Sequence, residues 1–142
     1  MVKSTFSPIF YRRFIDDVIT VFNDSKHIDM FHKFLNERHP NLKFTIEVGS
    51  KSLAFLDVLI KLKDEIVTTE IYRKPTFTGL LLNYGAMCPI KWKNSLVNGM
   101  LHRAYTVSSD WNLFHIECSK IMNILKRNSY PINMIQKSIK HF

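Results

Sequence analysis

The chain has 142 residues, 46% of them hydrophobic, which is enough for one ordinary core or for two small lobes. It contains no run of about 18 consecutive apolar residues, so we expect no membrane span. Residues 1–13 contain no apolar segment long enough for a signal peptide. The two cysteines, Cys88 and Cys118, lie far apart in the sequence, which favours a reduced, intracellular protein.

The excess positive charge is confined to the second half of the chain. Residues 1–70 carry ten Lys and Arg and ten Asp and Glu, so their charges balance. Residues 71–142 carry ten basic residues against only Asp110 and Glu117, a surplus of eight. Such asymmetry indicates a polyanionic partner, because neutralising phosphates releases condensed counterions. The alternative is ordinary solubilising charge.

Two β-branched runs within residues 11–22 flank the adjacent carboxylates of Asp16 and Asp17. This pattern predicts a β-hairpin with the acidic pair at its turn. Hairpin turns favour Asn-Gly or Asp-Gly, so Asp-Asp points to a role besides turn formation. Paired carboxylates suit hard divalent cations such as Mg²⁺. The alternative is a solvated hairpin tip that binds nothing.

The rest of the first half is predicted to form one helix and three strands. The helix begins at Asp24 or Ser25 and runs to about residue 38. The strands are predicted over residues 42–48, 53–62 and 66–72, with a turn at 63–65 between the last two. The fold class is therefore α+β, an antiparallel sheet with a helix packed on one face.

The second half is predicted to form three helices. The first begins at Pro89 and presents an apolar stripe at four-residue spacing, consisting of Trp92, Leu96, Met100 and Ala104. Residues 108–110 end it and cap a second helix, whose apolar face includes Phe114, Cys118, Ile121, Met122 and Leu125. A cysteine within such a stripe is typical of a small core residue. Tyr130-Pro131 closes the second helix, and residues 132–139 add a third. The three helices are therefore predicted to form a small bundle or a helix-turn-helix-like unit.

Several short motifs occur in a distinctive order, at Phe14–Asp17, Phe55–Asp57, Ile71–Thr76, Thr78–Gly79, Leu82–Tyr84, Pro89 and Arg103–Ala104. Their order and spacing resemble those of the reverse transcriptases of Penelope-like retroelements, from the catalytic hairpin into the thumb. The resemblance covers about residues 11–131, although Phe14 stands where Tyr is commoner. It implies the later part of a polymerase palm at residues 1–78 and a helical thumb at 79–142.

The resemblance also implies a reaction, RNA-templated addition of deoxynucleotides to a primer 3′ end with Mg²⁺ as cofactor. Asp16 would be a metal ligand and Asp17 would support the site. Two-metal phosphoryl transfer needs a further carboxylate from an earlier palm strand. Residues 1–15 contain no Asp or Glu, so the chain alone is expected to be inactive unless a partner chain supplies the missing palm and fingers.

Six residues are candidates for contacts with a primer-template. By resemblance the strand end at Tyr72, Arg73 and Lys74 grips the primer, and Lys91, Lys93 and Arg103 lie on the polar face of the first thumb-like helix. Solvated bases at a strand end and on a surface helix are the alternative. The second reading of function is a non-catalytic nucleic-acid-binding module, or a retroelement remnant without function. Either reading predicts a nuclear location and no membrane partner.

Overall fold

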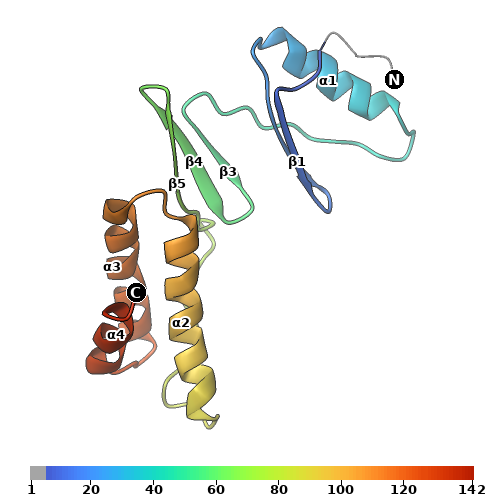
Figure 1. The fold of residues 1–142 in the computed structure, drawn as a ribbon. Coiled ribbons are helices and arrows are strands. Elements are labelled where there is room, and N and C mark those ends of the chain that lie inside the picture. Colours follow the sequence, from blue (N-terminus) through green and yellow to red (C-terminus); the bar gives the residue numbers. More distant parts are fainter. Residues whose placement is uncertain (1–5) are drawn as a thin grey trace. The chain divides into compact units, whose positions relative to one another are not determined.

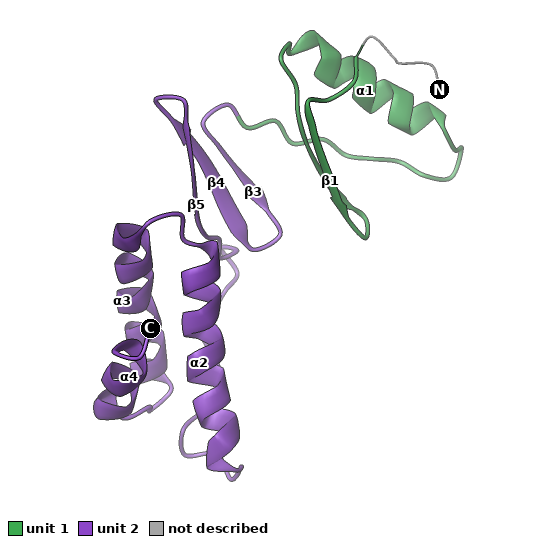
Figure 2. Cartoon of the chain, viewed as in Figure 1, with its two compact units in different colours: residues 1–49 green, residues 50–142 purple. Residues whose placement is uncertain are grey.

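The computed structural model describes residues 6–142. The expectation that residues 1–13 contain no signal peptide therefore falls partly on residues 1–5, which lie outside the described part. Residues 6–142 form the predicted α+β fold, with a two-stranded and a three-stranded antiparallel sheet and four helices (Figure 1). The chain divides into two compact units, Met1–Gly49 and Ser50–Phe142 (Figure 2). Within the described range, no helix has the length and apolar character needed to cross a membrane.

Unit 1 contains a hairpin of β1 (Phe10–Phe14) and β2 (Asp17–Val21), followed by α1 (Lys26–Glu37). Phe14 pairs with Asp17, so the turn consists of Ile15 and Asp16. The predicted hairpin is therefore confirmed, but the placement of both carboxylates in its turn was wrong by one residue. Ile15 takes a positive φ of 52°, a conformation that β-branched residues rarely adopt.

The strand predicted over residues 42–48 does not form. The backbone of this segment is bound by side chains of α1 instead. The Phe44 N–H donates to Asn36 Oδ1 at 2.7 Å, and His32 Nε2 lies 2.7 Å from the Phe44 carbonyl oxygen. Side chains of the helix thus satisfy the backbone groups that a strand would offer to a neighbour. Val48 at the end of the segment remains 65% exposed. The alternation of apolar residues was therefore insufficient, because no strand pairs with it.

Unit 2 begins with a meander of β3 (Ser52–Phe55), β4 (Val58–Lys63) and β5 (Ile66–Ile71), in that spatial order. The single strand predicted over residues 53–62 is wrong, because a turn at Leu56 and Asp57 divides it. Leu56 has a φ of 57°, which reverses the chain. The predicted turn at residues 63–65 is confirmed. Its central residues, 64 and 65, both take the positive φ of a tight hairpin.

The three predicted helices are confirmed as α2 (Ile90–Val107), α3 (Trp111–Arg127) and α4 (Ile132–Ile139). Pro89 and Pro131 immediately precede α2 and α4. Asp110 caps α3, since its Oδ1 accepts a hydrogen bond from the Leu113 N–H at 2.8 Å. These start signals are local, which explains why the helix bounds could be predicted from the sequence.

The core of unit 2 lies between the three helices. Its largest fully buried side chains are Leu101, Ile121, Leu125, Ile135 and Val97. The predicted buried face of α3 is confirmed, including Cys118. The predicted face of α2 is confirmed at Ala104, which is buried, and at Leu96 and Met100, which are half-buried against the core. It was wrong at Trp92, which is 57% exposed, and it missed the buried Lys93, Val97 and Leu101.

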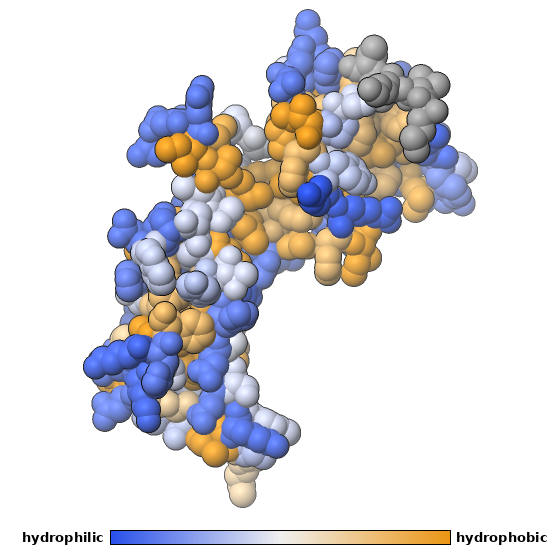
Figure 3. All heavy atoms as spheres, viewed as in Figure 1, coloured by the Kyte–Doolittle hydropathy of each residue, from blue (hydrophilic) through white to orange (hydrophobic). Residues whose placement is uncertain are grey.

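The three-stranded sheet is joined to the helices by direct contacts. The Thr69 hydroxyl donates to the Val107 carbonyl at 2.7 Å, and the Ser109 N–H donates to the Thr69 carbonyl at 3.0 Å. The sheet therefore belongs with the helices in one unit, whereas the predicted palm–thumb boundary falls at residues 78/79. In the view of Figure 3, hydrophobic surface gathers over the hairpins, and the helical bundle is largely hydrophilic.

Candidate nucleic-acid interface

Helices α3 and α4 are joined by a tight turn of four residues, 128–131. Ser129 takes a φ of 67° and its N–H donates to the Lys126 carbonyl at 3.0 Å. The Tyr130 N–H donates to the Leu125 carbonyl at 3.1 Å. These two bonds form a Schellman motif, which satisfies the last carbonyls of α3 and redirects the chain. Pro131 then starts α4, so the arrangement is a helix-turn-helix.

The buried Asn128 ties this turn to the segment before α2. Its Nδ2 donates to the Gly79 carbonyl at 2.8 Å, and its Oδ1 accepts from the Leu81 N–H at 2.9 Å. The Asn128 carbonyl also accepts from the Tyr84 N–H at 2.9 Å. One residue at the end of α3 thus fixes a segment that lies 47 to 49 residues earlier in the chain.

Helix α4 presents one polar face to solvent. Ile135 on the opposite side is fully buried in the bundle. The exposed polar residues recur at the spacing of a single helical face, and they are Asn133, Gln136 and Lys137 within α4 and Lys140 at its C-cap. Ile132 in the first turn is also 48% exposed. Asn and Gln side chains can form paired hydrogen bonds with adenine, and Lys can contact guanine or phosphate. This face therefore has the chemistry needed to read base edges.

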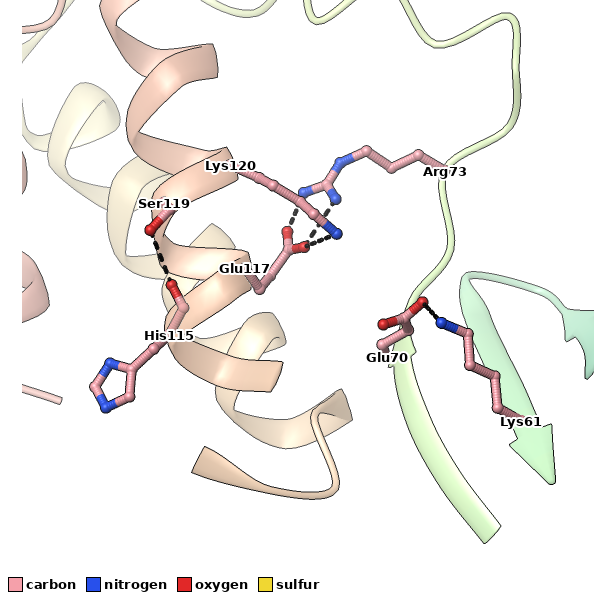
Figure 4. A network of polar contacts seen from close by, with 7 residues as sticks. All are labelled: Lys61, Glu70, Arg73, His115, Glu117, Ser119 and Lys120. Carbon is pink, nitrogen blue, oxygen red and sulfur yellow. Dashed lines mark hydrogen bonds and ion pairs between the residues drawn. The ribbon is translucent and has the colours of Figure 1, made fainter. Parts of the chain in front are cut away.

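A second polar cluster joins the end of β5 to α3 (Figure 4). Both terminal nitrogens of Arg73 donate to the Glu117 carboxylate, one of them at 3.0 Å. The Glu117 side chain is only 4% exposed, and Lys120 Nζ lies 3.7 Å from its Oε2. Arg73 was predicted to contact phosphate, but the structure commits its guanidinium to this buried carboxylate. The pair holds the segment after β5 against α3.

Burial raises the pKa of the Cys118 thiol, and the neighbouring Glu117 carboxylate raises it further. Because the raised pKa favours the protonated thiol, Cys118 is neutral near pH 7 and does not offset the positive charge of α3. The thiol is an inert core group, as its place in the apolar stripe predicted. Among residues 6–142 no three His, Cys, Asp or Glu side chains gather into a metal-binding group.

The predicted site residues do not form one cluster. Asp16 and Asp17 are exposed on the hairpin of unit 1, and the nucleic-acid-binding candidates all lie in unit 2. Tyr72 is half-buried, with its N–H bonded to the Asp57 carbonyl at 2.8 Å. Lys74 and Lys91 are exposed, and contacts of either residue with nucleic acid stay predictions.

Two of the predicted contacts on α2 have other partners. Lys93 was placed on the polar face, but it is only 9% exposed and its ammonium lies 4.9 Å from the centre of the Tyr84 ring. Its predicted position on the polar face was wrong because the buried side of α2 includes Lys93 as well as Ala104. Arg103 is exposed and pairs with Asp57 at 2.6 Å, which joins α2 to the β3–β4 turn.

Sequence reasoning did not single out the polar residues of α3 and α4. Lys120, Asn123 and Arg127 recur at positions i, i+3 and i+7, opposite the apolar stripe of α3, and this spacing was a usable signal. Asn128 offered no such signal, because its partners are distant in the sequence.

Residues 80–140 match the family described as the animal helix-turn-helix domain. The matched segment begins just after Gly79 and includes all three helices of the bundle. No curated protein and no solved structure matches the chain.

Proposed function

We propose that unit 2 is a helix-turn-helix module that binds double-stranded nucleic acid, with α4 in contact with the base edges. The observation that carries this proposal is the row of exposed Asn133, Gln136, Lys137 and Lys140, which follows a tight turn. In helix-turn-helix proteins the second helix enters the major groove. The match of residues 80–140 to a helix-turn-helix family supports the same reading.

The charge of the second half supports a duplex partner independently of the fold. Its surplus of eight positive charges lies in unit 2, which contains all of residues 71–142. Exposed lysines on α4 supply part of this surplus close to the proposed reading face. Binding to phosphates should therefore weaken steeply as salt is raised, because condensed counterions are released on binding.

The test uses the full chain and a pool of random-sequence DNA duplexes, from which bound sequences are selected and then measured by fluorescence anisotropy. Asn133→Ala combined with Gln136→Ala should weaken binding to the selected sequence by roughly 5- to 150-fold for each amide–base pairing that is removed. The matched control is Asn94→Ala with Asn98→Ala, an exposed amide pair on α2. No salt-dependent binding, or an equal weakening in both double variants, would contradict the proposal.

A second candidate function is part of a reverse transcriptase, with the helices of residues 79–142 gripping the primer-template as a thumb. The observation that favours it is the β1–β2 hairpin, which exposes Asp16 and Asp17 at one end. Two carboxylates fit the donor set of Mg²⁺, but they supply only part of a two-metal site. This chain would then contribute ligands, and the missing part of the palm and the fingers, from another source, would bind the deoxynucleotides.

Primer extension tests this second candidate. The chain alone should not extend an RNA-templated primer in Mg²⁺. A chimera that adds the earlier palm strand and fingers of a Penelope-like reverse transcriptase should extend it, and Asp16→Ala should abolish that activity. If the chimera extends primers equally well with Asp16→Ala, the catalytic assignment of the hairpin fails.

A further inference from the structure

A shallow pocket of about 280 Å³ lies between the segment after β5 and the outer face of α3. It is lined by cationic, polar and apolar groups together, namely Arg73, Phe77, Thr78, Gly79, Lys120, Asn123, Ile124 and Arg127. We propose that this pocket binds one nucleotide of a single-stranded nucleic acid, with its phosphate at Lys120 and Arg127 and its nucleoside against Phe77.

The pocket is held open by an anchor at each end of the segment that forms its wall. At one end Arg73 is bound to the buried Glu117. At the other end Asn128 holds the carbonyl of Gly79. Gly79 itself has a φ of 76°, and a Cβ there would meet Ile124 at 3.9 Å, so glycine is required for its backbone conformation rather than for space. The wall is therefore pre-formed.

The charges around the pocket favour an anion. Among the described ion pairs, Glu117 supplies the one carboxylate close to the pocket. Both terminal nitrogens of Arg73 donate hydrogen bonds to that carboxylate. Lys120 also lies near Glu117, at 3.7 Å, but its side chain is 50% exposed. Arg127 has no carboxylate partner within residues 6–142. Three cations against one carboxylate leave a surplus of two, which suits a phosphodiester.

The apolar side of the pocket distinguishes a nucleotide from a free phosphate. Phe77 is 43% exposed, and the Arg73 guanidinium lies 5.8 Å from the centre of its ring. Ile124 continues the apolar wall. An aromatic face beside cationic groups is the usual combination in sites for single strands, where bases stack on side chains. A base within a duplex is already stacked on its neighbours, so the pocket selects a single strand.

This inference goes beyond the duplex binding proposed for α4, because it uses another helix, another probe and a pocket wall, residues 73–79, that precedes the family match. The probe is a fluorescein-labelled oligo(dT) of twelve nucleotides, titrated with the full chain at several salt concentrations. Failure of the α4 variants to change duplex binding would leave the oligo(dT) result intact, so the two proposals fail separately.

Lys120→Gln combined with Arg127→Gln should weaken oligo(dT) binding at least tenfold and lower the salt slope by about 1. The control Lys63→Gln with Lys126→Gln removes the same charge from two exposed lysines of unit 2 outside the pocket and should cost at most threefold. Phe77→Leu keeps every charge and should cost at least about fivefold.

Circular dichroism confirms that each variant is folded before it is titrated. Three outcomes would overturn the pocket proposal. They are absence of oligo(dT) binding by the unmodified chain, an equal weakening in the two charge variants, and unchanged affinity in Phe77→Leu.

Discussion

Replacement of Asn128 by alanine tests whether one buried side chain holds the linker before α2 to the end of α3. The substitution removes the hydrogen bonds from Nδ2 to the Gly79 carbonyl and from the Leu81 N–H to Oδ1. Asn128 is only 4% exposed, so water does not readily replace these bonds. A buried group left without a partner costs about 1–3 kcal/mol, and two such groups that partly relax give an expected loss of about 2–4 kcal/mol.

Urea unfolding followed by circular dichroism at 222 nm measures this loss, because the signal comes mainly from the helices. The midpoint should fall while the slope with urea stays constant, which identifies a change in stability rather than in the unfolded state. The control is Asn112→Ala in the exposed first turn of α3, which should change stability by less than about 0.5 kcal/mol. A loss below about 1 kcal/mol, or one equal to the control, would refute the inference that Asn128 holds the segment before α2 to the end of α3.

Two further predictions concern the neighbouring Glu117 and Cys118. Glu117→Gln leaves the Arg73 guanidinium facing a neutral amide, so unit 2 should lose about 3 kcal/mol or more in the same urea assay. The double variant of Arg73→Gln with Glu117→Gln should lose less than the sum of the two single losses, and a loss equal to that sum would argue against direct pairing. Iodoacetamide at pH 8 should label Cys88 in the folded chain but Cys118 only in urea, because burial raises the Cys118 pKa. The Cys118 pKa in the folded chain lies above its ordinary value of 9.0. The contribution of Cys118 to stability is therefore present below about pH 9 and is lost as the pH rises through the higher folded pKa. A loss of stability at alkaline pH that is unchanged in Cys118→Ala would contradict this prediction.

The helices of unit 2 could be predicted from the sequence because their signals are local. Pro89, Asp110 and Pro131 mark the starts of α2, α3 and α4, and each acts within one turn of its own helix. The turn at residues 64 and 65 was equally local, as it separates two strands that pair with each other. Contacts at longer range did not enter these predictions.

The errors arose where distant contacts decide the structure. The alternation of residues 42–48 predicted a strand, but the backbone of Phe44 is bound by side chains of α1. On α2 four-residue spacing from Trp92 reaches the buried Ala104, but the earlier buried positions, Lys93, Val97 and Leu101, lie one residue after those that the spacing predicts. The packing of β5 and α3 against α2 decides which side chains are buried, and it buries Lys93.

The candidate site shows the same division. Lys74 and Lys91 were predicted at a strand end and on the polar face of a helix, and both are exposed, as those local patterns imply. The partner of Arg73 could not be predicted, because Glu117 lies 44 residues away and is the only acidic residue of α3. From the sequence alone, Arg73 at a strand end suggested a phosphate contact. The fold instead places the buried Glu117 carboxylate beside it. The charge left over belongs to Lys120 and Arg127, which follow Glu117 on the same helix.

Two hairpin turns are preceded by phenylalanine, and they show how the same local structure can serve different roles. In Phe14-Ile15-Asp16 and Phe55-Leu56-Asp57 the aliphatic residue takes a φ of 52° and 57°, and an aspartate follows it in the turn. An aliphatic side chain in this conformation costs about 1–2 kcal/mol, so the flanking strand pairs must stabilise both turns. Asp57 then pairs with Arg103 and joins the sheet to α2. Asp16 forms no ion pair within residues 6–142. Its carboxylate is accordingly the one of the two that remains available to an external cation, which is what a catalytic role for the first hairpin would require.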